Sequence, residues 1–127
     1  MAQSDIDHPS HYAHPTGVEC LEIAGVLPFV LGNAVKYLWR AGRKGSPASD
    51  LRKAAWYLRQ GPQHLRVSAL PVAKMQLVAS HPSTHTVLRI LLLAFVALAE
   101  RNEPGAIDAG ACCEMLEKEA SDLERVS

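Results

Sequence analysis

Proline and glycine divide this sequence into short segments, and the apolar residues within most segments recur with the period of an α-helix. The alternation of apolar and polar residues that is typical of a half-buried strand is absent almost everywhere. We therefore predict an all-α fold, a small helical domain with an irregular N-terminal arm and a long central apolar helix. The expected helices cover residues 19–26, 28–41, 47–60, 72–79, 84–102 and 107–125.

Local signals at the ends of these segments support the boundaries. Gly42 suits a left-handed C-terminal cap, and Ser46 followed by Pro47 suits a helix start. Residues 61–71 contain two prolines and are expected to form a linker or bend. Ser83 or Thr84 is expected to cap the following long helix.

The helix predicted over residues 84–102 is apolar on every side between Ile90 and Ala99, a run of ten residues. A membrane-spanning helix needs about 20 apolar residues, so this segment is predicted to be buried in protein and no membrane partner is expected. A helix of this kind belongs in a core or at a subunit interface. We therefore expect a homo-oligomer.

Two further features indicate a cytoplasmic protein. Residues 1–7 lack the basic and apolar stretches of an export signal. Cys20, Cys112 and Cys113 cannot form a disulfide framework, because the last two are adjacent, and reduced thiols are the better interpretation.

The net charge of zero hides a strong segregation. Residues 32–66 contain eight lysines and arginines against one acid, whereas residues 100–127 contain eight acids against three bases. A concentrated basic segment in a neutral chain indicates a small phosphate-bearing partner. Nucleic acid is not expected, because a long phosphate backbone requires a larger basic surface.

The basic segment also contains aromatic residues. A helical projection places one set on the polar face of the first helix of this segment, namely Asn33, Lys36, Tyr37 and Arg40. On the next helix, Trp56 lies on the polar side between Arg52 and Lys53. Two interpretations stay open: the aromatics pack between helices or subunits, or the bases hold phosphates while an aromatic stacks on a nucleobase.

Four ordered blocks make the sequence more specific. They are DHPSHY at residues 7–12, GVEC at 17–20, GNAVKYLWRAGRK at 32–44 and DLRKAAWYL at 50–58. Together they resemble the SaV-like family of small phage and prophage proteins, over about residues 5–60. The resemblance implies a kinase-type domain over residues 1–61, with residues 62–127 as a helical extension of unknown type packed on it.

That family includes a phage nucleotide kinase without the usual phosphate-binding loop, associated with dTMP and dGMP as acceptors. The resemblance therefore implies nucleotide binding and transfer of a phosphoryl group from a nucleoside triphosphate to a (deoxy)nucleoside monophosphate. A Walker A loop is absent here, and a clamp of basic side chains is the expected replacement. The expected catalytic residues are His11, Lys36 and Arg40. The expected nucleotide-binding residues are His8, Tyr12, Asn33, Tyr37, Arg43, Lys44, Arg52, Lys53 and Trp56.

Two other functions stay open. A non-catalytic protein that sequesters a nucleotide would use the same clamp without turnover. A pyrophosphohydrolase would use paired acids, and Glu100, Glu103, Glu119 and Asp122 resemble the Mg²⁺-binding pattern of the MazG-type enzymes.

No metal site is expected from the sequence, and no cofactor is required, although Mg²⁺ can accompany the nucleotide. His8, His11 and His14 recur every third residue, and they either chelate a metal or make local turn hydrogen bonds. His81 and His85 with the Cys112–Cys113 pair lack the spacing of a zinc site. A GXXG loop at residues 42–45 lacks the sheet that an RNA-binding KH domain needs.

Overall fold

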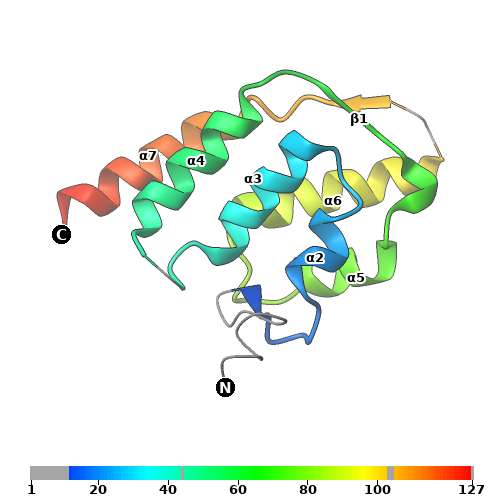
Figure 1. Ribbon diagram of the computed structural model, residues 1–127, viewed down its shortest axis with the longest axis horizontal. Helices are drawn as coiled ribbons and strands as arrows, with labels where there is room; N and C mark the ends of the chain where they lie inside the picture. The colour runs from blue at the N-terminus through cyan, green and yellow to red at the C-terminus, as the bar shows by residue number, and fades with distance from the viewer. Residues whose placement is uncertain (1–11, 44, 103–104, 127) are drawn as a thin grey trace.

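The computed structural model describes residues 12–43, 45–102 and 105–126, and helices dominate these parts of the chain (Figure 1). The helices are α2 (Cys20–Ala24), α3 (Phe29–Arg40), α4 (Pro47–Leu58), α5 (Val72–Ala79), α6 (Thr86–Arg101) and α7 (Cys112–Arg125). A short 3₁₀ helix covers Val67–Ala69, and two strands cover Gln63–Leu65 (β1) and Gly105–Ile107 (β2). No helix in the described ranges has the length and apolar character needed to cross a bilayer.

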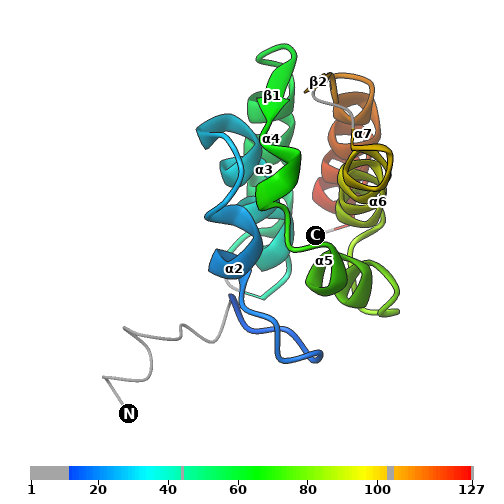
Figure 2. The same cartoon turned by 90° about the vertical axis from the view of Figure 1, so that its right-hand side faces the viewer.

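Helix α4 packs against both α3 and α7, so the first half of the chain and its last helix share one core. Figure 2 shows α2 and α3 on one side of the molecule and α6 with α7 on the other. Ile23, Leu51, Phe95 and Leu116 are all fully buried in this core, although they come from four different helices.

The predicted boundary between the two basic helices is confirmed. The Ser46 hydroxyl accepts a hydrogen bond from the Ser49 amide at 3.2 Å, which satisfies one of the amides at the start of α4. Gly42 has a φ of +82°, a conformation that side-chain-bearing residues rarely adopt, so the chain turns sharply after α3.

The prediction that the chain lacks strands is wrong. β1 pairs with β2 in an antiparallel ribbon, with Gln63 opposite Ile107 and Leu65 opposite Gly105. Each strand has three residues, which is too short to show a period of two in the sequence. The segment predicted as a linker therefore contains ordered structure, and Leu65 within it is buried.

The ends of the last two helices also differ from the prediction. His85 caps α6, because its side chain accepts a hydrogen bond from the Val87 amide at 3.0 Å. Thr84 is instead buried, and its hydroxyl donates to the Val78 carbonyl at 2.6 Å. Helix α7 begins only at Cys112, because Ile107 belongs to β2 and residues 108–111 form a turn outside the helix.

The central position expected for α6 is only partly seen. One face of α6 is buried and packs chiefly against α5. Ile90 and Leu93 on its other face are 42% and 50% exposed. The expected homo-oligomer stays a prediction.

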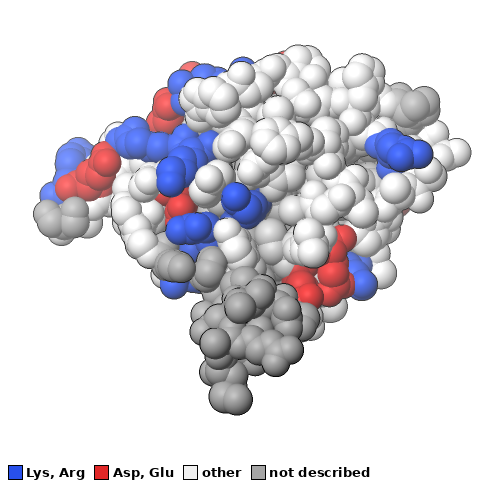
Figure 3. Space-filling model, viewed as in Figure 1, with Lys and Arg blue, Asp and Glu red and all other residues white. Residues whose placement is uncertain are grey.

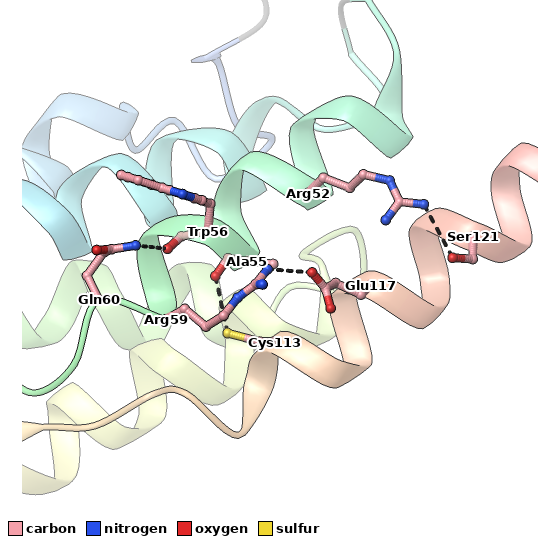
Figure 4. A network of polar contacts seen from close by, with 8 residues as sticks. All are labelled: Arg52, Ala55, Trp56, Arg59, Gln60, Cys113, Glu117 and Ser121. Carbon is pink, nitrogen blue, oxygen red and sulfur yellow. Dashed lines mark hydrogen bonds and ion pairs between the residues drawn. The ribbon is translucent and has the colours of Figure 1, made fainter.

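Basic side chains in and directly after α4 form ion pairs with acidic side chains of α7. Arg52 bonds Ser121 and Glu124, and Arg59 bonds Glu117, all three partners lying on α7. Figure 4 shows both arginines reaching toward α7. The acidic C-terminal helix therefore neutralises one side of the basic segment, and only the rest of that segment remains for a ligand.

Candidate nucleotide site

A cavity of about 650 Å³ lies between residues 12–20, helix α2 and the first half of α3. Its size is within the range of small-molecule sites. Its walls are mostly apolar, with Val18, Leu21, Ala24, Leu27 and Phe29 among the lining residues. Such a cavity fits a planar ring system better than a strongly charged group.

Close packing of α2 on α3 shapes this cavity. A Cβ atom on Gly32 would lie 2.8 Å from the Ala24 carbonyl oxygen, too close for any side chain. The second motif block of the sequence supplies Cys20, whose thiol lies in the cavity wall. Burial raises the pKa of Cys20 to about 12, against a smaller opposing effect of Lys36, so this thiol is protonated at neutral pH.

Three of the predicted site residues line the cavity, namely Tyr12, Asn33 and Lys36. The Asn33 side-chain amide donates to the Phe29 carbonyl at 2.8 Å, which fixes the side chain and leaves its oxygen as an acceptor. Lys36 is the one lysine or arginine among the described lining residues. The cavity therefore combines an apolar interior with one fixed amide, one cation (Lys36) and one acid (Glu19).

His14 holds the N-terminal arm against the corner between α5 and α6. Because the Thr16 amide donates to His14 Nδ1 at 3.2 Å, the ring proton must be on Nε2. Nε2 then donates to the Thr84 hydroxyl at 3.1 Å. Of the two interpretations of this histidine, local turn hydrogen bonds are therefore confirmed, with a long-range bond in addition.

The His14 contacts predict a pH-dependent stability. Burial, and then the charges of Arg43 and His81, lower the pKa of His14 from its ordinary value of 6.5. In the unfolded chain His14 gains a proton near pH 6.5, whereas the folded protein resists protonation until lower pH. The free energy of unfolding should therefore fall as the pH drops below about 6.5.

Urea unfolding at pH 7.5 and 5.5 tests this expectation. A His14→Gln variant should lose less stability between the two pH values than the natural protein, because glutamine does not titrate. His64→Gln is the matched control, since His64 is exposed on β1. Equal losses in the natural protein and in His14→Gln would contradict the assignment.

A second group of predicted residues forms a row of rings on the face shared by α3 and α4. Tyr37 and Tyr57 stack with their ring centres 6.0 Å apart, and Trp56 meets Tyr57 edge-on at 5.1 Å. We call Trp56, Tyr57 and Tyr37 the aromatic row. Lys36 and Lys53 both lie against Tyr37, with their Nζ atoms 4.7 and 5.4 Å from the ring centre.

Arg40 is bonded within the protein and is only partly exposed. Its Nε donates to Asp50 Oδ2 at 3.3 Å, and the Arg40 and Asp50 side chains are 23% and 3% exposed. A hydrogen bond with Tyr12, and then the charge of Asp50, raises the pKa of Arg40. This arginine links α3, α4 and the arm, and any bound phosphate competes with Asp50 for it.

The remaining predicted residues are dispersed. Arg43 bonds the Ala13 carbonyl and so fastens the arm, while Arg52 bonds α7. His8, His11 and Lys44 lie outside the described residues. Figure 3 shows basic side chains gathered over the half of the surface that holds α3, α4 and α7.

No group of three metal-binding side chains occurs in the described ranges. Each described acid of the paired-carboxylate pattern bonds other side chains: Glu100 contacts Gln76, Glu119 contacts His85, and Asp122 contacts Lys118 and Arg125. Glu103 lies outside the described residues. Cys113 donates to the Ala55 carbonyl at 3.2 Å instead of facing His85.

The comparisons with known proteins match the part of the chain that contains the cavity and the aromatic row. Residues 6–59 match the family model DUF3310, described as a protein of unknown function. The matched range contains every described residue of the cavity and of the aromatic row. The site and the family match therefore coincide.

The Gene 1.7 protein of Enterobacteria phage T3 is a similar curated protein, 38% identical over 65 residues. The alignment covers 43% of this chain and 40% of the relative, so the chain spans well under half of the relative's length. No solved structure matches the chain. The region of the cavity is therefore similar to a phage protein and to a family of unknown function.

Sequence reasoning missed several parts of the site. The apolar cavity wall, including Leu21 and Phe29, carries no motif by itself. Tyr57 lies within the fourth sequence block but is not among the expected site residues. The signal for the cavity wall and for the aromatic row is the exposure of large apolar side chains. This exposure is known only from the three-dimensional structure.

Proposed function

We propose that this chain binds nucleotides and transfers a phosphoryl group from a nucleoside triphosphate to a nucleoside monophosphate. The observation that carries the proposal is the cavity with Asn33 and Lys36, which has nucleotide size and lies wholly within the residues that match the phage family. A base fits its apolar interior, where the Asn33 oxygen accepts a hydrogen bond from a ring N–H or amino group. The monophosphate then lies at Lys36.

Phosphoryl transfer asks little covalent chemistry of a protein. It requires positioning of the two nucleotides and neutralisation of the charge on the transferred group. Lys36 supplies a cation at the cavity, and Arg40 lies one helical turn further along α3. Mg²⁺ brought by the triphosphate is expected to supply the remaining neutralisation.

Product analysis of the full chain tests this function. The protein is incubated with ATP and each of several nucleoside monophosphates, dTMP and dGMP included, with and without Mg²⁺. Ion-exchange chromatography should show a new nucleoside diphosphate from the monophosphate, together with ADP.

Two other results would each indicate a different function. Pyrophosphate and a monophosphate formed from a triphosphate would indicate a pyrophosphohydrolase. Saturable binding of a nucleotide with no product would indicate sequestration. Either result contradicts phosphoryl transfer.

A further inference from the structure

The aromatic row lies outside the cavity and has features that the cavity does not use. Trp56 is 57% exposed. Its indole extends away from α7, whereas the neighbouring Arg52 and Arg59 reach toward α7 (Figure 4). None of the three rings of the row is among the cavity-lining residues. An exposed indole on a basic surface offers a ring face on which a nucleobase can stack.

The two lysines of this face are available to a ligand. Within the described ranges, no carboxylate forms an ion pair with Lys36 or Lys53. This distinguishes them from Arg40, Arg52 and Arg59, which all bond acids. Among the described residues, this face therefore has two cations without a carboxylate partner next to stacked rings, a combination suited to a base with phosphates.

Lys36 connects the row with the cavity. Its side chain lines the cavity, and its Nζ lies 4.7 Å from the centre of the Tyr37 ring. Lys53 approaches the same ring from α4. A ligand along the row and a ligand in the cavity would therefore have their phosphates close to one shared cation.

We propose that the aromatic row is a second nucleotide subsite, which binds the nucleoside triphosphate with its base on Trp56 and its phosphates at Lys53 and Lys36. This inference rests on the proposed function and assigns the cavity to the acceptor monophosphate. Every base has a face that stacks on an indole, so the subsite selects for triphosphate rather than for a particular base.

The arrangement gives a balanced transfer. An oxygen of the acceptor's phosphate attacks the γ-phosphorus of the triphosphate and forms a new P–O bond. The bond from the γ-phosphorus to the bridging oxygen breaks, and the leaving diphosphate keeps the electron pair. The products are two nucleoside diphosphates, and Lys36 contacts the oxygens on which charge accumulates.

The test measures ATP binding to the full chain by calorimetry, without an acceptor, in two surface variants. Trp56→Ala and Lys53→Gln should each weaken ATP binding roughly fivefold or more, from the loss of stacking or of a charged contact. Lys118→Gln on α7 removes the same charge from an exposed site and should bind ATP normally. Circular dichroism checks that the variants are folded.

Two further measurements separate the contribution of base stacking from that of charge, and the aromatic row from the cavity. Inorganic triphosphate should bind less tightly to Lys53→Gln but normally to Trp56→Ala, because it has no base. Binding of dTMP and dGMP should change in neither variant, because the cavity holds them.

Unchanged ATP affinity in both variants, or no ATP binding to the natural protein, would overturn the subsite. If the two variants lost ATP binding and monophosphate binding equally, the aromatic row would not be a subsite separate from the cavity. Diphosphate formation in the turnover assay would still support the proposed function in these cases, so the two failures are distinguishable.

Discussion

Replacement of Lys36 with alanine is expected to lower the affinity for nucleotides by about 10- to 100-fold, the cost of losing one charge-assisted contact. The reason is the position of this side chain, which lines the cavity and lies against Tyr37. The effect on turnover should be larger, about 100-fold or more, if the contact strengthens as charge develops on the transferred phosphate. Alanine is a good helix former, so α3 should stay intact.

Calorimetry with ATP and with monophosphates, followed by the turnover assay, measures both effects. Lys118→Ala is the control, because Lys118 is an exposed lysine on α7 that pairs only locally with Asp122 among the described residues. Equal nucleotide affinity in Lys36→Ala and Lys118→Ala would show that the cavity does not use this cation.

Replacement of Arg40 with methionine is expected to destabilise the protein by about 3 kcal/mol, the cost of leaving a buried charge without its partner. Asp50 is 3% exposed, and its carboxylate bonds Arg40 at 3.3 Å. The matched comparison is Arg59→Met, because the pair of Arg59 with Glu117 is half exposed and should contribute about 1 kcal/mol or less.

Urea unfolding of the two variants measures the difference. The double variant Arg40→Met with Asp50→Asn should recover part of the loss, because the charge left behind is removed. Equal destabilisation by Arg40→Met and Arg59→Met would contradict a structural role for Arg40. This measurement must precede any kinetic interpretation of Arg40 variants, since an unfolded protein also loses activity.

The helices could be predicted because their signals are local. Gly42 and Ser46 determine the boundary between α3 and α4 through backbone conformation and a side-chain cap, both readable from neighbouring residues. The ribbon of β1 and β2 could not be predicted in the same way. Its pairing joins Gln63 to Ile107, which are far apart in the sequence. No local sequence signal predicts a contact between residues at such a separation.

The candidate site was predictable in its residues but not in its arrangement. The projection of α3 correctly placed Lys36 and Tyr37 on one face, with the opposite face buried. The projection also placed Arg40 on this polar face. The structure shows that Arg40 is only partly exposed, because Asp50 approaches it from α4. Which cations α7 neutralises depends on tertiary packing, and a helical projection of one segment has no information about it.

The pairing of β1 with β2 closes a long loop of the chain. Since Leu65 lies opposite Gly105, the chain leaves the α4–α7 pair and returns to it at the same place, with the 3₁₀ helix, α5 and α6 in between. The entropic cost of closing a loop grows only slowly with its length, so the number of residues between the two strands has little effect on the cost of pairing them. This loop lies outside residues 6–59, which match the family model.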